Sequence, residues 1–372
     1  MKTQAYTLFT CLMLATSPLA AGQVYTSTEH QFELTQVASG LEHPWSLAFL
    51  PGGDMLVTER EGRLRRIRDG VLVAAPISGV PELVVSGQGG LLDVVLHPQF
   101  AANHTLFLSY AHRSSDGMTT RVARATLEGD ELTDVEVIFE ALPRSGTSRH
   151  FAGRMAFDRS GYLYIAVGDR GDKDRAQDTG DDAGGVHRIT INGEAAPGNP
   201  GLGNGEINDT LFTWGNRNIQ GMTVHPESGA IWTHEHGPRG GDEINIVRSG
   251  TNYGWPEITY GIGYTGLPIS FHTEKPGMAQ PLHYWDPSIA PSGMAFYTGE
   301  NFPRWRSNLF VGALKMRKLV RLDIRDGKVR EEEDILTELD ERIRDVRDGP
   351  DGSLWLLTDS SNGKVYRLDP VQ

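Results

Sequence analysis

One twelve-residue stretch, HEHGPRGGDEIN from His234 to Asn245, combines side chains that scaffolding rarely needs together. Its Gly-Pro pair and the following Gly-Gly can bend the chain so that carbonyl oxygens face one centre, and Asp242 and Glu243 add carboxylates nearby. Ca²⁺ prefers such oxygen ligands. A zinc site would need a third ligand beside His234 and His236, and the stretch offers none. By itself, the stretch fits either a calcium site or a solvated loop held by Asx turns.

A second candidate is His150 in SRHFAGRMAF, just before a predicted strand. The ordinary pKa of imidazole lies near neutrality, so a histidine in this position can serve as a general base. An exposed loop histidine without a chemical role would fit the same pattern. The choice between the two depends on what surrounds it.

Cationic and amide side chains recur at the ends of predicted strands. They are Gln88 in SGQGGLLDVV, Arg217, Asn218 and Gln220 in WGNRNIQGM, Lys315 in ALKMRK, and Arg342 and Arg344 in ERIRDVRDGPDG. Arg342 and Arg344 alternate and so should point the same way. Converging guanidinium groups suit a ligand with several carboxylates. A surface charge ladder explains any single pair, but the recurrence in a chain of net charge -13 favours a binding site.

Six passages that would carry these residues share one pattern: an apolar strand, a turn rich in Gly, Pro or Asp, and a second apolar strand. They begin at Trp45, Leu91, Gly153, Gly221, Gly293 and Ile343. Period-two alternation, as in LWLL from Leu354, is typical of strands. The turns PGG, DRSG, PESG and GPDG suit hairpins, where Gly and Asp tolerate positive φ.

Repetition at intervals of roughly 45 to 75 residues predicts an all-β protein, a six-bladed β-propeller of four-stranded antiparallel blades. Each blade is too small to bury its own faces and needs neighbours on both sides. A β-sandwich would need fewer hairpins. Because no linker or composition break interrupts the pattern, residues 23–372 are expected to form one catalytic domain. Functional loops of such a fold gather at one end of the central channel.

The N-terminal residues 1–22 have the features of a signal peptide: Lys2, an apolar run from Leu8 to Ala15, and a small-residue cleavage site. The sequence therefore predicts export, and we expect a periplasmic protein. The single cysteine, Cys11, lies in this segment, so the mature chain would have no thiol chemistry. No later segment has the length and apolarity of a membrane span. The net charge of -13 argues against a nucleic-acid partner.

Taken together, these blocks resemble the soluble quinoprotein aldose dehydrogenases, relatives of soluble glucose dehydrogenase that use pyrroloquinoline quinone (PQQ). The resemblance runs from about Leu41 to Asp369 and is closest to the bacterial periplasmic branch. It is carried by GQGGLLDVVLHPQF, WGNRNIQGM, EHGPRGGDEIN, NYGWP, SGMAF and RIRDVRDGPDG. The blocks are specific as a set, whereas each alone is only suggestive.

The resemblance implies catalytic roles for two residues. His150 would be the general base that takes the proton of the sugar C1 hydroxyl during hydride transfer to PQQ, and Arg217 would stabilise charge developing on the quinone. The implied cofactor contacts are Gln88, Arg217, Asn218, Tyr264, Ala313, Leu314, Lys315, Arg342, Ile343 and Arg344.

The resemblance also implies Ca²⁺ as a second cofactor. Carbonyl oxygens of Gly237 and Pro238 would hold the ion that polarises the quinone, and Glu243 and Tyr253 would be calcium ligands, Tyr253 through its main-chain oxygen. Whether these four residues serve one ion or two stays open.

Two positions depart from soluble glucose dehydrogenase. Arg149 stands where that enzyme has an acidic residue beside the base, so the carboxylate that would orient His150 is absent there. Asp286, next to Trp285, stands where it has a tryptophan flanking the sugar. Specificity for glucose therefore does not follow from the resemblance.

The expected function is oxidation of the C1 hydroxyl of aldoses to lactones, with an external electron acceptor (a quinone or cytochrome) and a monomeric or homodimeric protein. One alternative is a calcium-dependent propeller lactonase in which His150 activates water. Another is a non-catalytic carbohydrate-binding propeller. A cluster of cationic side chains close to His150 would favour the dehydrogenase over the lactonase and the carbohydrate-binding propeller.

Overall fold

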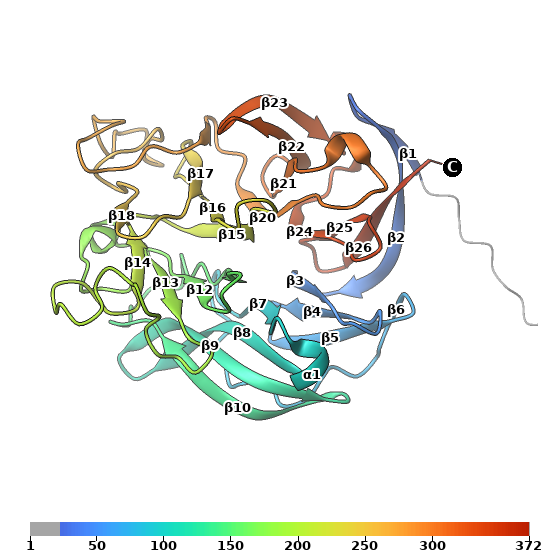
Figure 1. The fold of residues 1–372 in the computed structure, drawn as a ribbon, viewed down its shortest axis with the longest axis horizontal. Coiled ribbons are helices and arrows are strands. Elements are labelled where there is room, and N and C mark those ends of the chain that lie inside the picture. Colours follow the sequence, from blue (N-terminus) through green and yellow to red (C-terminus); the bar gives the residue numbers. More distant parts are fainter. Residues whose placement is uncertain (1–22, 372) are drawn as a thin grey trace, which may run out of the picture.

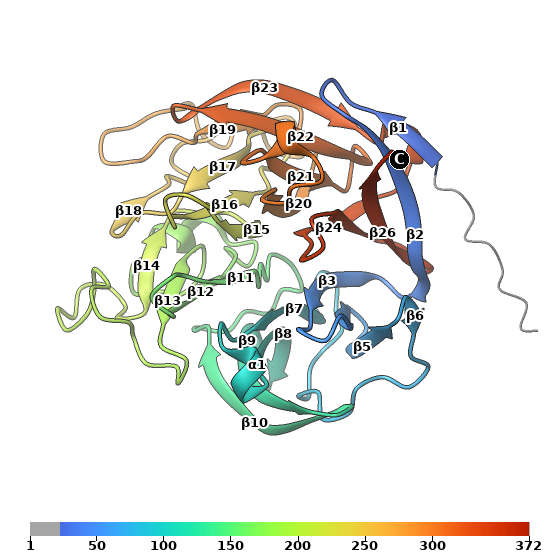
Figure 2. The ribbon, with the colours of Figure 1, turned by 45° about the vertical axis from the view of Figure 1, so that its right-hand side comes forward.

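A computed structural model describes residues 23–371, and six β-sheets stand in a ring around a central axis (Figure 1, Figure 2). Each sheet has four antiparallel strands at its core, so the predicted six-bladed β-propeller is confirmed. Helix in the described residues is limited to α1 (Phe100–Asn103), η1 (Lys173–Gln177), η2 (Pro303–Trp305) and η3 (Thr337–Leu339). None of them could cross a membrane. The predicted signal peptide, residues 1–22, lies outside the described part.

The first three blades come from the first two thirds of the chain. Blade 1 contains β3 (Pro44–Phe49), β4 (Met55–Glu59), β5 (Arg63–Arg68) and β6 (Val71–Leu72). Blade 2 contains β7 (Leu91–Leu96), β8 (Thr105–Ser114), β9 (Gly117–Glu128) and β10 (Glu131–Glu140). Blade 3 contains β11 (Met155–Phe157), β12 (Leu163–Ala166), β13 (Val186–Ile189) and β14 (Leu211–Trp214), and the short β18 (Thr251–Asn252) adds to it in parallel.

The last three blades complete the ring. Blade 4 contains β15 (Ile219–Val224), β16 (Ile231–Glu235), β17 (Asp242–Ile246) and β19 (His283–Trp285). Blade 5 contains β20 (Pro291–Phe296), β21 (Leu309–Ala313), β22 (Lys318–Arg325) and β23 (Lys328–Ile335). Blade 6 contains β24 (Ile343–Asp348), β25 (Leu354–Thr358) and β26 (Gly363–Pro370), joined by β2 (Gln31–Leu41) and β1 (Gln23–Thr26).

The six repeated passages supply the innermost strand of each blade. Adjacent inner strands contact one another in the order β3, β7, β11, β15, β20 and β24, and β24 returns to β3. The hairpins after these strands follow the predicted turn chemistry: Gly53, Gly161, Gly229 and Gly352 all have positive φ.

Ring closure uses a strand that the repeat pattern did not predict. The N-terminal β2 pairs antiparallel with the C-terminal β26, from Phe32 opposite Pro370 to Leu41 opposite Gly363. Both ends of the described part, residues 23–371, thus belong to blade 6, in which Phe32 is fully buried and meets Trp305 edge-on with ring centroids 5.5 Å apart. Backbone hydrogen bonds between the chain ends therefore hold the ring shut.

The hydrophobic core lies between the blades. Leu47 and Val57 of blade 1 pack with Trp355 and Leu357 of blade 6, for example, in one buried cluster. Each sheet consequently buries its faces against its neighbours, as expected for blades that are too small to fold alone.

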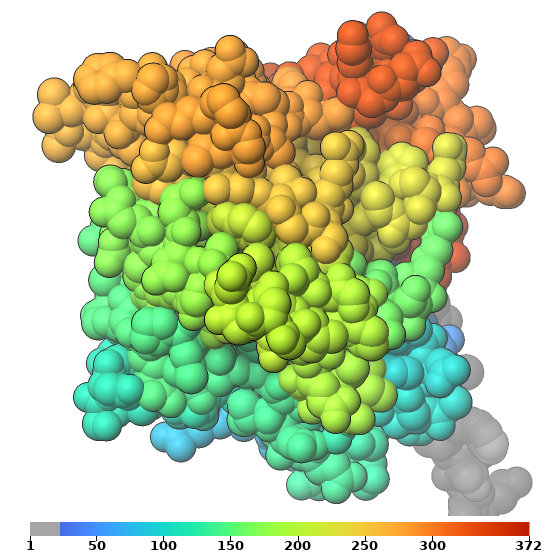
Figure 3. All heavy atoms as spheres, turned by 60° about the vertical axis from the view of Figure 1, so that its left-hand side comes forward, coloured from blue at the N-terminus to red at the C-terminus, as the bar shows by residue number. Residues whose placement is uncertain are grey.

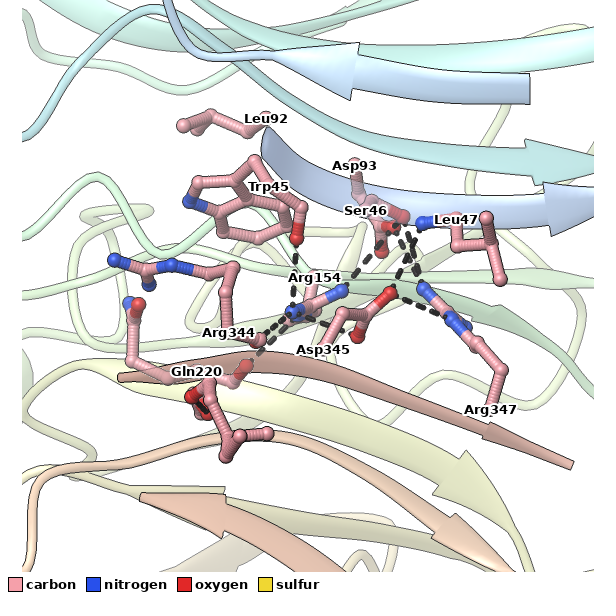
Figure 4. Close-up of polar contacts among 12 residues, drawn as sticks. Trp45, Ser46, Leu47, Leu92, Asp93, Arg154, Gln220, Arg344, Asp345 and Arg347 are labelled. Atoms are coloured by element: carbon pink, nitrogen blue, oxygen red, sulfur yellow. Dashed lines mark hydrogen bonds and ion pairs between the residues drawn. The ribbon is translucent and has the colours of Figure 1, made fainter. Parts of the chain in front are cut away.

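A buried ion network lies at the centre, where the inner strands converge (Figure 4). Arg154, only 2% exposed, pairs with Asp93 of β7 at 3.5 Å and with Asp345 of β24 at 3.0 Å. Arg347 of β24 pairs with the same two carboxylates at 3.3 and 2.8 Å. Ser46 of β3 donates a hydrogen bond to Asp93. The positive charges of the two arginines thus offset the negative charges of the two aspartates. Together with Ser46, these residues link blades 1, 2, 3 and 6.

We expect Arg154→Met to destabilise the protein by about 3–5 kcal/mol, because it leaves the buried carboxylates of Asp93 and Asp345 with only one of their two guanidinium partners. Urea unfolding followed by circular dichroism measures this change. Arg330→Met is the control, since Arg330 pairs with Asp326 on the surface, where ion pairs contribute little. Equal midpoints for the two variants would contradict the structural role of the network.

Candidate functional site

Five of the sequence-predicted residues lie at one end of the propeller for a topological reason. Successive strands of a blade run in opposite directions, so the loop entering the first strand and the loop leaving the second strand share one end. Gln88, His150, Asn218 and Arg342 precede the inner strands β7, β11, β15 and β24, and Leu314 follows the second strand β21.

A cavity of about 250 Å³ opens among these loops. It is lined by Trp45, Arg60, Gln88, Leu92, Phe151, Ala152, Asn218, Gln220, His236, Ala290, Leu314, Arg342, Arg344 and Asp359. Five residues that the resemblance implied as cofactor contacts therefore line one cavity: Gln88, Asn218, Leu314, Arg342 and Arg344.

His150 is not itself a lining residue of this cavity, but in the chain it directly precedes two residues that are, Phe151 and Ala152. It is buried, with 8% of its surface exposed, and its backbone N–H donates to Oε1 of Gln88 at 2.7 Å. Its Nδ1 lies 2.6 Å from Oδ1 of Asp169. Burial lowers the pKa of His150 below its usual 6.5, and the Asp169 carboxylate partly opposes this effect. The imidazole is consequently neutral near pH 7, with Nδ1–H donated to Asp169 and Nε2 left as the basic atom.

Asp169 provides the carboxylate that is absent at Arg149. It comes from the loop after β12, and its oxygens also accept hydrogen bonds from the indole Nε1 of Trp255 at 2.9 Å and the backbone N–H of Gly171 at 2.7 Å. Although burial alone would raise it, the hydrogen bonds from His150 and Gly171 and the charge of Arg217 keep the pKa of Asp169 below its usual value. The sequence reasoning missed this residue; its only signal was a polar GDRGD motif directly after a strand.

Arg342 and Arg344 point the same way, as their alternation predicted. Both guanidinium groups donate to Oδ2 of Asp359, at 3.2 and 2.8 Å, and Arg342 also donates to the carbonyl oxygen of Leu314 at 3.1 Å. The Asp359 carboxylate accepts from His43 as well, through a contact of 2.9 Å. Asp359, another residue that the sequence reasoning missed, therefore holds both arginines in place.

Four other predicted cofactor contacts do not line the cavity with their side chains. Lys315 is exposed just beyond Leu314, and Tyr264 is 71% exposed. Tyr264 belongs to the loop region between β18 and β19, whose atoms are coloured orange at one corner of the surface in Figure 3. Ala313 and Ile343 are buried residues of β21 and β24 beside the cavity loops.

A second, much smaller cavity of about 10 Å³ adjoins the first and shares His236 with it. Arg217 lines it and donates from its guanidinium group to the carbonyl oxygens of His236 and Gly237, at 3.0 and 3.1 Å. Its backbone N–H donates to the Glu235 carboxylate. Burial lowers the pKa of His236 to about 3, so this imidazole carries no charge near neutral pH.

Two carboxylates face this small cavity from adjacent strands. Glu235 of β16 is opposite Glu243 of β17, and both are among the lining residues. Burial raises the pKa of Glu235 to about 7, and burial together with the charge of Glu235 raises the pKa of Glu243 well above its usual value. The nearby Arg217 guanidinium lowers the pKa of Glu235 but does not outweigh the effect of burial.

Tyr253 also lines the small cavity, but its hydroxyl donates to the carbonyl oxygen of Ile246 at 2.5 Å. A cation there would have to use its carbonyl instead. Within residues 23–371, no group of three or more His, Cys, Asp or Glu side chains is arranged to hold a metal ion. Any cation site here would combine the carboxylate pair with backbone oxygens.

The turn at Gly237 and Pro238 is buried, which excludes the solvated-loop interpretation of this part of the stretch. Asp242 organises it by accepting from the backbone N–H of Gly237 at 2.8 Å and from Ile289 and Ala290 at 2.8 and 3.0 Å. A side chain at position 237 would not fit, since its Cβ would lie 2.0 Å from the carbonyl oxygen of Gly240.

Asp169→Asn should lower the pKa of His150 further, because the carboxylate that opposes the effect of burial is removed. Histidine-ring NMR between pH 4 and 8 would show a more acidic midpoint and a changed ¹⁵N shift at Nδ1. Asp172→Asn, an exposed change in the same loop, is the control. An unaltered His150 titration in Asp169→Asn would refute the pairing.

The chain matches the family described as Glucose / Sorbosone dehydrogenase over residues 41–367. It is 45% identical to an aldose sugar dehydrogenase, YliI, of Escherichia coli (strain K12) over 336 residues, 89% of this chain and 91% of that protein. The apo crystal structure of the soluble E. coli aldose sugar dehydrogenase superposes with a TM-score of 0.88 at 43% identity, covering 91% and 100% of the two chains. The PQQ-bound aldose sugar dehydrogenase of Streptomyces coelicolor gives a TM-score of 0.74 at 28% identity, covering 91% and 98%.

Proposed function

The chain belongs to the glucose/sorbosone dehydrogenase family, and from this premise we propose that it is a PQQ-dependent enzyme that oxidises the C1 hydroxyl of aldoses to give lactones. The observation that carries the proposal is a cationic cavity next to a buried His150–Asp169 pair. The relative from S. coelicolor, whose structure holds PQQ, supports the choice of cofactor.

The charges around the larger cavity suit a flat tricarboxylate such as PQQ. Its lining contains three guanidinium groups, on Arg60, Arg342 and Arg344, and one carboxylate, on Asp359, which leaves an excess of two positive charges. This surplus stands out in a chain whose net charge is -13. Guanidinium groups bind carboxylates through paired, charge-assisted hydrogen bonds, so these arginines fit the acidic cofactor.

The smaller cavity suits Ca²⁺. Glu235 and Glu243 supply hard, anionic oxygens, Gly237 and Tyr253 can supply carbonyl oxygens, and Pro238 follows in the same turn. A divalent cation would favour the ionised form of both carboxylates and so oppose the burial that raises their pKa values. The volume of about 10 Å³ is of the order that one small occupant requires.

When bound, PQQ supplies an electrophilic carbonyl carbon for hydride and Ca²⁺ polarises that carbonyl. His150 takes the proton of the sugar C1 hydroxyl at Nε2, because Nδ1 is already bonded to Asp169. Asp169 fixes the ring orientation and stabilises the imidazolium that results. Arg217 contributes a fixed positive charge, held in place by two backbone carbonyls.

Neither alternative needs the whole arrangement. A lactonase has no use for the surplus of guanidinium groups, and a carbohydrate-binding propeller has no use for a buried His–Asp pair. We further propose export to the periplasm, reoxidation by an external quinone or cytochrome, and a monomeric or homodimeric protein in which residues 23–372 form one catalytic domain.

Purified apo-protein should oxidise aldoses in a dye-linked assay only after both PQQ and Ca²⁺ are added. His150→Ala should still bind PQQ, measured by fluorescence titration, but lose at least about 100-fold in turnover because the base is gone. Hydrolysis of lactones without added quinone would instead support the lactonase. Sugar binding without either activity would support the binding propeller.

Ca²⁺ should raise the thermal stability of the apo-protein, by about 2.7 kcal/mol at a concentration one hundred times its Kd. Glu243→Gln should abolish most of this gain, because the site loses a charged ligand. Glu257→Gln is the control, since Glu257 pairs with Lys275 on the surface. Calorimetry with and without Ca²⁺ measures both, and an undiminished calcium effect in Glu243→Gln would contradict the assignment.

A further inference from the structure

Arg60 is a cavity residue that neither the sequence reasoning nor the resemblance singled out. It follows β4, at the same end of the ring as the other site residues. Its backbone is fixed between blades 1 and 2: its N–H donates to the carbonyl oxygen of His43 and its own carbonyl accepts from Leu91, both at 3.1 Å. Gly90 lies so close that a Cβ there would be 2.0 Å from the Arg60 carbonyl oxygen. The side chain therefore starts from a rigid point.

The guanidinium group of Arg60, unlike those of the arginines around it, has no carboxylate within hydrogen-bond distance in the described part of the chain. Arg342 and Arg344 donate to Asp359, and Arg63 and Arg65 donate to Glu59. Arg60 makes no side-chain hydrogen bond within residues 23–371, and the carboxylate paired with it, on Glu61, is 3.8 Å away.

The side chain of Arg60 is also largely withdrawn from solvent, with 26% of it exposed. Its Nε is buried and has no hydrogen-bond partner among the described residues. A buried donor without a partner is unfavourable, because it has given up its hydrogen bonds to water. Since the same side chain lines the larger cavity, a ligand in that cavity is positioned to satisfy it.

The chemistry of the group specifies that ligand. Nε and a terminal nitrogen of guanidinium form a planar pair of donors that matches the two oxygens of a carboxylate. Sugar hydroxyl groups lack the charge that would compensate a partly buried cation. Asp359 already shares its charge between Arg342 and Arg344, so the only carboxylate paired with Arg60 among the described residues is that of Glu61, at 3.8 Å.

We infer that Arg60 binds a carboxylate of the flat acidic cofactor, as a third anion-binding arginine beside Arg342 and Arg344. The inference rests on the proposed function. It adds a residue that determines the affinity for the cofactor and takes no part in proton transfer.

The test is a titration of apo-protein with PQQ in the presence of Ca²⁺, followed by quenching of tryptophan fluorescence, since Trp45 lines the cavity. Arg60→Gln should weaken binding roughly tenfold to a hundredfold, the usual effect of losing a charge-assisted contact. Arg60→Lys should fall between that variant and the natural protein, because it keeps the charge without the paired donors. The affinity of Arg60→Gln should also depend less steeply on salt.

Arg68→Gln is the matched control: it removes the same charge from blade 1, at a surface position paired with Asp54. It should bind PQQ like the natural protein. Thermal unfolding of each variant verifies that it is folded. A Kd for Arg60→Gln within twofold of the natural value, or an equal loss in Arg68→Gln, would overturn the inference.

A second probe, benzene-1,3,5-tricarboxylate, separates this inference from the proposed function. This compound is flat and triply acidic but cannot accept hydride. If the natural protein binds the tricarboxylate through Arg60 but does not bind PQQ, the anion site stands and the enzymatic proposal fails. If it binds neither compound, both fail.

Discussion

The central network around Arg154 constrains the whole molecule, because its charges can be buried only while several blades stand in register. Breaking a buried ion pair costs several kcal/mol, so the inner strands that carry Asp93 and Asp345 are held at fixed distances. The same guanidinium donates to carbonyl oxygens of Trp45, Gln220 and Arg344, whose side chains line the cavity above it (Figure 4). The Arg154 network at the centre of the ring thus also supports the backbone of three residues that line the larger cavity, and so forms the floor of the site.

Above that floor, the site is divided into two parts that differ in their ionisable groups and share His236. The larger cavity has more guanidinium groups than carboxylates, and the smaller one has two carboxylates with raised pKa values. Arg217 lies with the carboxylates, where its guanidinium is bonded to main-chain carbonyls. An anionic cofactor next to a divalent cation would neutralise both parts at once, which is why we assign the two ligands together and not separately.

The fold was largely predictable because its signal is local. The repeated strand–turn–strand passages located the inner strand of every blade, and the turns PGG, DRSG, PESG and GPDG located the hairpins of blades 1, 3, 4 and 6. The pairing of β2 with β26 was missed, since it joins residues more than three hundred positions apart and leaves no local pattern. The site divides in the same way. Arg342 and Arg344 were found from their alternation, whereas Asp359 and Asp169 act from other loops, and nothing in their own sequence neighbourhoods marks them as partners of an arginine or a histidine.

What the sequence by itself determined is the repeat, the strand ends at which polar residues collect, and the chemical types that gather there. These depend on interactions between near neighbours in the chain. Only the tertiary structure decided which of those residues meet, because ring closure brings loops from different blades together and buries them. The fold brings His150 and Asp169 together as a hydrogen-bonded pair and places Glu235 opposite Glu243. It also leaves the buried Nε of Arg60 without a hydrogen-bond partner among the described residues. Lys315 and Tyr264 were predicted as cofactor contacts in the same way, but their side chains are exposed and do not line that cavity.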